Sequence, residues 1–347
     1  MTLPLSSAPA ASSWKQLNSL PDPVGFAGMA AGVLNGRLVA TGGSQWDLPI
    51  WRKGTRSFND VIFVLSEPSG TWKKLDTRLP AKSGHFASAS TEGAIYLAGG
   101  NNTEGCLATA YEMKAEGDSI VFRRLPDLPK ALGYAAGVVA GGRFFVLGGV
   151  PDPASKAPSR EVWSLEIVKP NATWKREADL PGAGVIVPSV AAQGESIFLF
   201  GGMAFDAEGK ATPSRAAYRL ARSGESWETL PDLPEPRVGG VTPCPQLPDG
   251  SLWLIGGYAE VWGGAQREHP GFSAQTLFYR PKEKTWSSGP LLPKGAEPDR
   301  DAAGDPGPVP MVAAPAVVWK DHVVVVGGEV RIATRTPAVL AWPLKRQ

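Results

Sequence analysis

The feature that most constrains the fold is a Gly-Gly pair that ends a β-like apolar run in each of six repeats. Successive pairs stand roughly 50 residues apart, with a longer last gap, at 42–43, 99–100, 148–149, 201–202, 256–257 and 327–328. Each run follows a dipeptide that favours a two-residue turn, at 35–36, 92–93, 141–142, 193–194, 249–250 and 320–321. Because another apolar stretch precedes each turn, the sequence predicts six β-hairpins that end in Gly-Gly.

Two further strands complete each repeat, and we call the four strands A to D. Strand C follows a variable loop, as in "DVIFVL" at 60–65 and "TLFYRP" at 276–281. Strand D carries an aromatic residue, as in "TWKKL" at 71–75, and a Leu-Pro pair comes after it. Four strands per unit, a Gly-Gly signature and a period near 50 residues resemble the kelch repeat of β-propellers.

The two ends of the chain indicate how the ring closes. The sequence opens with a D-strand motif, "SWKQL" at 13–17, and ends with a C strand around 338–342. We therefore expect an all-β, six-bladed kelch-type propeller over residues 13–347, in which the N-terminal strand completes the last blade and hides the sheet edges. Residues 1–12 are expected to be a disordered leader or tail, since they lack the charged and apolar segments of an intact signal peptide.

Composition excludes several classes of function. The formal net charge is +2 with no basic block, which argues against nucleic-acid binding. No apolar run approaches the roughly 20 residues of a membrane span. Two cysteines, Cys106 and Cys244, and three widely spaced histidines supply neither a disulfide framework nor a metal-ligand pattern. We therefore expect no metal, no cofactor and no membrane partner.

The loops between strands B and C, here called the B–C loops, are long and varied, whereas the A–B turns are short. Because strands alternate in direction, all B–C loops fall on one face of the disc, and long loops on a rigid scaffold commonly carry function. One of them reads "GGEVRIATRTPAV" at 327–339. Glu329 directly follows the Gly-Gly pair, where the other repeats have the uncharged residues Ser44, Asn101, Val150, Met203 and Tyr258.

This charged loop has two interpretations from sequence. Arg335 can be an arginine of the repeat, because Arg56, Arg160 and Arg215 also precede a C strand, and Glu329 can be its ordinary ion-pair partner. Alternatively, a carboxylate partly withdrawn from water near the channel serves as a general acid or base. An adjacent guanidinium then clamps a substrate carboxylate.

The motif "GGEVRIATRTPAV" resembles that of the sialic acid mutarotases, or N-acetylneuraminate epimerases, which are six-bladed kelch-like propellers. In that family a Glu directly after the glycine and an Arg six residues later form the functional pair, and Glu329 and Arg335 stand at these positions. The stretch "GFAG" at 25–28 resembles a second blade of the family. Since the Glu-Arg blade is last here and the "GFAG" blade first, the chain is similar to a cyclically permuted branch.

The resemblance implies an isomerase that interconverts the α and β anomers of N-acetylneuraminate or a related sugar acid, without a cofactor. Glu329 would exchange protons with the sugar, and Arg335 would hold the substrate carboxylate or a developing oxyanion. Arg331 would support them. The resemblance also implies a periplasmic or secreted protein, and we expect a monomer or weak homodimer.

Further substrate-binding candidates come from position alone. Arg52, Arg56 and Trp51 belong to the first B–C loop, and His85 opens an A strand that borders the channel. Arg237 and Gln275 hold comparable positions in the fifth repeat, where His269 is expected to be exposed.

Other functions remain open from sequence. One alternative is a non-catalytic kelch propeller that binds a protein or a carbohydrate on its loop face. The tryptophans expected in these loops, Trp46, Trp51 and Trp262, are consistent with this alternative. A copper-radical oxidase needs clustered tyrosine, histidine and cysteine ligands, which the spacing does not provide.

Overall fold

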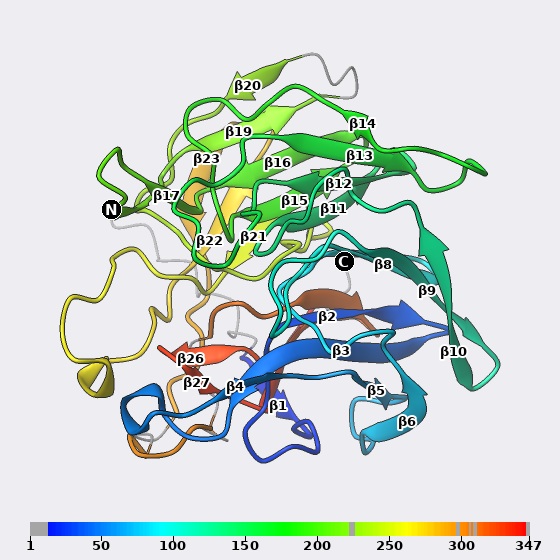
Figure 1. Ribbon diagram of the computed structural model, residues 1–347, viewed down its shortest axis with the longest axis vertical. Helices are drawn as coiled ribbons and strands as arrows, with labels where there is room; N and C mark the ends of the chain where they lie inside the picture. Colours follow the sequence, from blue (N-terminus) through cyan, green and yellow to red (C-terminus); the bar gives the residue numbers. More distant parts are fainter. Residues whose placement is uncertain (1–12, 222–225, 296–298, 305–306, 308–310, 345–347) are drawn as a thin grey trace, which may run out of the picture.

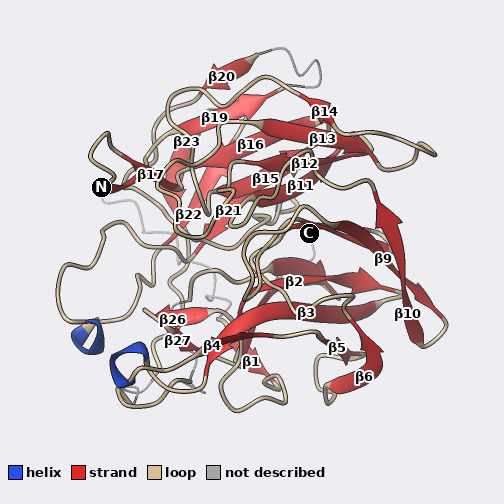
Figure 2. Cartoon of the chain, in the orientation of Figure 1, coloured by secondary structure: helices blue, strands red, loops and turns tan. Residues whose placement is uncertain are grey.

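The chain forms a ring of six β-sheets around a central axis (Figure 1). The computed structural model describes residues 13–221, 226–295, 299–304, 307 and 311–344, so the expected leader at 1–12 lies outside the described residues. Two short 3-10 turns, η1 (Ile50–Arg52) and η2 (Gln266–Glu268), are the helical elements of this described part, and they contact one another (Figure 2). The all-β propeller that the repeats predict is confirmed.

The first four blades contain the four strands that their repeats predict. The first has β2 (Ala27–Leu34), β3 (Arg37–Trp46), β5 (Val61–Leu65) and β6 (Lys73–Arg78), with β4 (Arg56–Phe58) paired to β3. The second has β7 (Ala87–Thr91), β8 (Ala94–Ala98), β9 (Ala110–Glu116) and β10 (Ser119–Leu125). The third has β11 (Ala136–Ala140), β12 (Arg143–Leu147), β13 (Val162–Glu166) and β14 (Lys175–Arg176). The fourth has β15 (Ser189–Gln193), β16 (Ser196–Phe200), β19 (Ala217–Leu220) and β20 (Trp227–Thr229), with a small hairpin of β17 (Met203–Phe205) and β18 (Ala211–Pro213) in its B–C loop.

The fifth and sixth blades differ from this pattern. The fifth is a three-stranded sheet of β21 (Leu252–Ile255), β22 (Thr276–Arg280) and β23 (Thr285–Ser288). Its predicted A strand is not regular, because Pro243 and Pro245 lack the N–H that a strand needs, and single bridges such as Val238 to Tyr258 take its place. The sixth contains β24 (Ala316–Trp319), β25 (His322–Val326) and β28 (Val339–Pro343), and its B–C loop folds into the hairpin of β26 (Glu329–Arg331) and β27 (Thr334–Arg335).

The N-terminal strand closes the ring as predicted. β1 (Lys15–Leu17) pairs antiparallel with β28, placing Lys15 opposite Ala341 and Leu17 opposite Val339. The sixth blade thereby gains its fourth strand from the opposite end of the chain. This pairing covers the edge that β28 would otherwise expose.

Most of the predicted turns are correct. Asn35 and Gly36 have φ values of 48° and 72°, and Lys320 and Asp321 are also left-handed, as two-residue hairpin turns require. Two turns were predicted wrongly. Gln193 pairs with Ser196, so the turn residues are 194–195 rather than 193–194. The turn at 249–250 is longer, because the N–H of Leu247 bonds to the carbonyl of Ser251.

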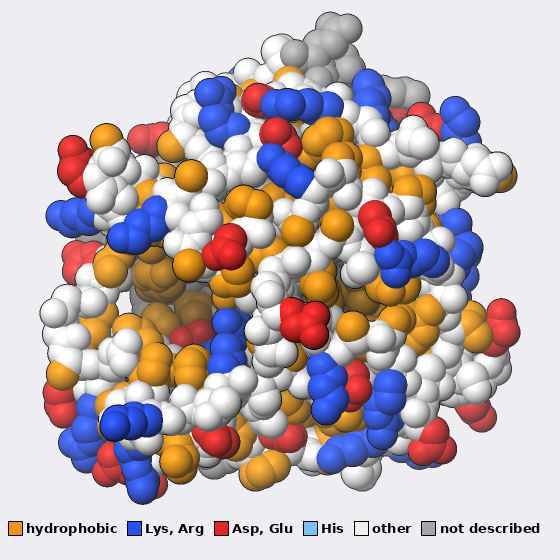
Figure 3. Space-filling model, in the orientation of Figure 1, with side chains coloured by type: hydrophobic (Ala, Val, Ile, Leu, Met, Phe, Trp, Pro, Cys, Tyr) orange, Lys and Arg blue, Asp and Glu red, His pale blue; other side chains and the backbone are white. Residues whose placement is uncertain are grey.

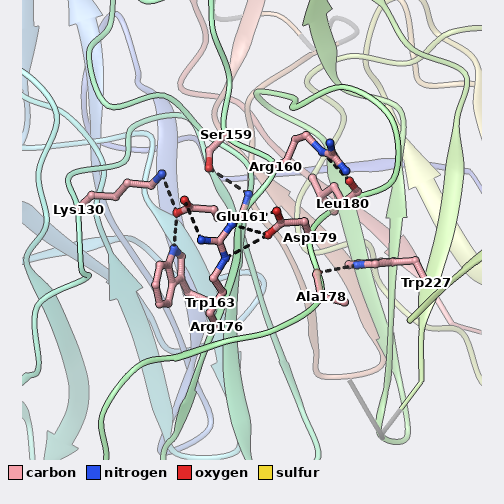
Figure 4. Close-up of polar contacts among 10 residues, drawn as sticks. All are labelled: Lys130, Ser159, Arg160, Glu161, Trp163, Arg176, Ala178, Asp179, Leu180 and Trp227. Atoms are coloured by element: carbon pink, nitrogen blue, oxygen red, sulfur yellow. Dashed lines mark hydrogen bonds and ion pairs between the residues drawn. The ribbon is translucent and has the colours of Figure 1, made fainter. Parts of the chain in front are cut away.

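The core lies between the blades rather than within any one of them. Buried side chains from neighbouring blades form shared clusters, as where Phe26 and Phe63 of the first blade pack with Trp319 of the sixth. The D-strand tryptophans add a hydrogen bond across four of these interfaces: Trp72 Nε1 to Asn18 O at 2.7 Å, Trp174 to Pro126 at 2.8 Å, Trp227 to Ala178 at 2.9 Å and Trp286 to Pro231 at 3.0 Å. Figure 4 includes the bond from Trp227. The aromatic residue of the repeat therefore ties each of these blades to the preceding one.

Candidate active site at the mouth of the axial channel

The backbones of six residues, one from each blade, form a closed ring of hydrogen bonds around the axis. One residue per blade, at the start of its innermost segment, has a left-handed φ between 44° and 71°: Gly28, His85, Tyr134, Val187, Gly239 and Ala313. The N–H of each donates to the carbonyl of its equivalent in the neighbouring blade, from His85 to Gly28 at 2.7 Å through to the closing bond from Gly28 to Ala313, also at 2.7 Å. Four of the six are not glycine, and residues in this conformation are commonly retained where function requires it.

The residue after each Gly-Gly pair lies directly against this axial ring. Glu329 exchanges two backbone hydrogen bonds of 2.8 Å with Val312, the neighbour of Ala313, and Asn101 pairs in the same way with Gly84. Around the axis, these positions are polar in the fifth, sixth, first and second blades and apolar in the third and fourth: Tyr258, Glu329, Ser44, Asn101, Val150 and Met203. A polar sector therefore covers one side of the channel mouth.

The channel itself is too narrow for a sugar. Its cavity measures about 40 Å³ and is lined by residues of all six blades, including His85, Tyr134 and Gly240. This is space for a few water molecules. On the face in Figure 3 the surface is hollowed beside the fifth B–C loop; hydrophobic side chains line much of the hollow, together with acidic and basic ones. A ligand of sugar size would sit at the mouth, against the polar sector.

Glu329 and Arg335 form a cross-strand ion pair in the hairpin of β26 and β27. Their backbones are paired in register, which brings Oε2 of Glu329 to 2.8 Å from Nη1 of Arg335. The other carboxylate oxygen, Oε1, accepts the N–H of Ala333 at 2.7 Å. The side chain of Glu329 is 20% exposed and that of Arg335 4%, so the acid is the more accessible member of the pair.

Arg335 is not the arginine of the repeat. Arg160 and Arg215 each follow a serine whose N–H bonds to the second glycine of its pair, and each donates Nε to a leucine carbonyl, Leu180 or Leu233, at 2.9 Å. Figure 4 shows this contact for Arg160. In the sixth blade the equivalent of the serine is Thr336, and Arg335 precedes it. The assignment of Arg335 to the repeat position is therefore wrong, because Arg335 precedes this residue whereas Arg160 and Arg215 follow it. The ion pair with Glu329 that this interpretation expected is present, and Nε of Arg335 donates to the carbonyl of Ser44 at 3.0 Å.

Arg56 also has contacts of its own. Its Nε and Nη2 both donate to Oγ of Ser44 at 3.1 Å, and Nη1 donates to the hydroxyl of Tyr134 at 3.0 Å. The amide of Asn101 donates to the same hydroxyl at 3.0 Å. The first three blades are thus joined through Arg56 at the channel mouth.

His85 completes this network as a neutral imidazole. Its Nε2 lies 3.1 Å from Oγ of Ser44, and its ring centre lies 4.9 Å from that of Tyr134. Burial, followed by the guanidiniums of Arg56 and Arg335, lowers the pKa of His85 well below 6.5. The hydroxyl oxygen of Ser44 already accepts two hydrogen bonds from Arg56, so its own O–H donates to Nε2 of His85. Because Nε2 then acts as an acceptor, the proton of the neutral imidazole is on Nδ1.

Two residues of the fifth blade border Glu329. Burial and, to a lesser extent, the Glu329 carboxylate together raise the pKa of Tyr258 to about 12, so this phenol remains an O–H donor at neutral pH. His269 was expected to be exposed and is instead buried, because it packs against Phe272 at 5.0 Å and accepts the N–H of Gly271 at 3.0 Å. Burial lowers the pKa of His269, and the positive charge of Arg331 lowers it further, whereas the Glu329 carboxylate raises it.

The remaining candidates lie elsewhere. Arg331 is buried beside His269 and donates to the carbonyl of Asp299 at 3.2 Å. Arg237 is buried and pairs with Glu235 at 2.5 Å, which occupies it structurally. Gln275 is exposed, and its backbone carbonyl is the atom that meets Arg237.

Arg52 and the short helical turns form the rim. Arg52 is exposed in η1, close to Asp301, and Arg267 of η2 pairs with the same aspartate at 2.9 Å. Only position along the chain suggested that Arg52, Arg237 and Gln275 bind a substrate, and this role stays a prediction. Among the described residues there is no group of three potential metal ligands and no helix suited to crossing a membrane.

Sequence reasoning missed four residues of the site. Ser44, Asn101 and Tyr258 occupy the same repeat position as Glu329, so their polarity at that position was the available signal. Tyr134 is the equivalent of His85 in the axial ring. A comparison of these two repeat positions across all blades would have identified the polar sector.

The fold and this loop face define a six-bladed kelch-type propeller with an acid–arginine pair at its channel mouth. No family model matches the chain. It is 30% identical over 150 residues to kelch domain-containing protein 8B of Rattus norvegicus, covering 42% of this chain and 41% of that protein. It is 30% identical over 107 residues to the N-acetylneuraminate epimerase of Haemophilus influenzae, covering 30% of this chain and 26% of the enzyme.

The chain thus spans less than half the length of the curated relatives it matches. The solved structure of YjhT superimposes on 93% of this chain and 96% of its own, with a TM-score of 0.67 and 17% sequence identity. These matches agree on the kelch-type propeller.

Proposed function

We propose that this protein is a mutarotase that interconverts the anomers of N-acetylneuraminate or a related sugar acid. The observation that carries the proposal is the Glu329 carboxylate, which is held at both oxygens yet is 20% exposed, on a residue whose backbone borders the axial ring. The partial match to the N-acetylneuraminate epimerase supports it. A fixed and accessible carboxylate suits a reaction that only moves protons.

Anomer exchange requires two proton transfers. Glu329 takes the proton of the anomeric hydroxyl as the ring oxygen gains one, the ring opens, and the carbonyl rotates and is attacked from its other face. We assign the donation toward the ring oxygen to the hydroxyl of Tyr258, which remains protonated at neutral pH and whose pKa the Glu329 carboxylate helps to raise. Arg335 keeps the carboxylate in position. No net change in atoms or charge results, so no redox step is involved.

The test is anomer exchange of N-acetylneuraminate followed by NMR. Glu329→Gln removes the proton acceptor while retaining size, and we expect exchange to slow by about 10²–10⁴-fold. The matched control is Glu104→Gln, because Glu104 is an exposed acid on the second B–C loop. Undiminished exchange in Glu329→Gln, or an equal loss in both variants, contradicts the proposal.

A second candidate function is protein binding on the loop face. Leu48, Val261 and Trp262 are exposed there by 42%, 50% and 37%, in the first and fifth B–C loops. The partial match to a kelch domain-containing protein is compatible with it. This alternative predicts that Trp262→Ala weakens partner capture, whereas the mutarotase proposal predicts that it leaves anomer exchange intact.

A further inference from the structure

Arg56 is a cation of the polar sector with no carboxylate partner among the described residues. Its side chain contacts the neutral hydroxyls of Ser44 and Tyr134 and the face of Phe58, 4.8 Å from the ring centre. By contrast, Arg335 is paired with Glu329 and Arg237 with Glu235. A partly buried guanidinium without a counter-charge is a binding site for an anion.

We propose that Arg56, rather than Arg335, anchors the carboxylate of the substrate. A guanidinium has five N–H donors, and the contacts to Ser44 and Tyr134 use three of them. One donor remains on each terminal nitrogen, and the residue is only partly buried, so it is accessible to a ligand. Ser44 and Tyr134 hold the guanidinium in one orientation, which reduces the entropy lost when an anion binds.

The charges around Arg56 favour an anion. Arg56 and Arg335 both lie close enough to His85 to lower its pKa. Burial lowers the pKa of Arg335, and the positive charge of Arg56 lowers it further, whereas the Glu329 carboxylate raises it. Glu329 compensates only one of these two positive charges. His85 is neutral and supplies no negative charge. A bound carboxylate would balance the second guanidinium.

The shared contact with Ser44 also favours one class of sugar. Ser44 is shared by both arginines, since Arg56 binds its hydroxyl and Arg335 binds its carbonyl. The anchor and the Glu329–Arg335 pair are therefore linked through one residue. In a 2-keto sugar acid the anomeric carbon carries both the carboxylate and the hydroxyl that must lose its proton. Such a substrate can place its carboxylate on Arg56 and its hydroxyl on Glu329, whereas an aldose has no carboxylate at that carbon.

This inference rests on the proposed function, and its test separates the two. The binding of N-acetylneuraminate and of its neutral methyl ester is measured by calorimetry in each variant, so that the ratio of the two affinities cancels any general loss of structure. We expect the wild-type protein to bind the acid about 10–100-fold more tightly than the ester, because hydrogen bonds to a charged group typically contribute an affinity difference of this size. Arg56→Gln should bring this ratio close to one.

The control variants define the alternatives. Arg78→Gln removes an exposed arginine of the same blade and should keep the wild-type ratio. Glu329→Gln should keep or raise the preference for the acid while anomer exchange is lost. An unchanged preference in Arg56→Gln, or no saturable binding of the acid by the wild-type protein, overturns the anchor. Unchanged exchange in Glu329→Gln overturns the mutarotase mechanism and leaves the anchor standing.

Discussion

Gly28 occupies the one position of the axial ring where an added methyl group would strike the candidate site. It has φ +71°, and a Cβ built there lies 2.5 Å from Nδ1, 2.6 Å from Cγ and 2.7 Å from Cε1 of His85. Contacts under 3.0 Å require a shift, and the imidazole cannot turn away freely, because it is bonded to Ser44 and packed on Tyr134. Gly28→Ala should therefore displace His85 and disturb the network around Arg56.

The cost of this substitution has two parts. A left-handed φ costs an alanine about 1–2 kcal/mol relative to glycine, and overpacking typically costs about 1–3 kcal/mol more. We expect Gly28→Ala to reduce the free energy of unfolding by about 2–5 kcal/mol. Gly36→Ala is a control for the first part alone, because Gly36 has φ +72° and nothing within 4 Å of its Cβ position. That control should lose only about 1–2 kcal/mol.

Urea denaturation of the two variants provides the assay. The difference between them measures the clash with His85, and the double variant Gly28→Ala/His85→Ala should recover most of it. If Gly28→Ala is no less stable than Gly36→Ala, or if removing the imidazole recovers nothing, His85 does not lie where the structure places it.

The remaining predictions concern His85 and the tryptophan tethers. The pKa of His85 is lowered in the folded protein, so below pH 6.5 the unfolded chain binds a proton that the folded chain does not. The contribution of His85 to the free energy of unfolding is therefore complete above pH 6.5, and it falls by up to about 1.4 kcal/mol for each unit of pH below that value. His85→Gln should flatten this slope in denaturation curves at pH 7.5 and 5.5, and an unaltered slope would contradict it. Trp286→Phe removes the N–H that bonds to Pro231 across two blades and should cost about 0.5–1.5 kcal/mol, whereas Trp262→Phe, which breaks a bond to Ala265 within one exposed loop, should change the melting temperature little.

The sequence by itself determined the ring. The period of the Gly-Gly pairs, the turn dipeptides and the D-strand aromatic residues are local signals, and each specifies a conformation or a contact that repeats once per blade. The strand motif at 13–17 and the unfinished last blade sufficed to predict closure by β1. The spacing of Glu329 and Arg335 likewise reflects a local hairpin, in which the two residues are direct cross-strand partners.

Only the tertiary structure decided which side chains share a site. Arg56, Tyr134 and Asn101 come from three blades, and their contacts depend on how closely those blades approach the axis. Burial of His269 and the pairing of Arg237 with Glu235 depend on loop packing in the same way. The charge balance that distinguishes Arg56 from Arg335 is a sum over residues far apart in the chain. Periodicity carries no information about such sums, because electrostatic interaction depends on distance in space.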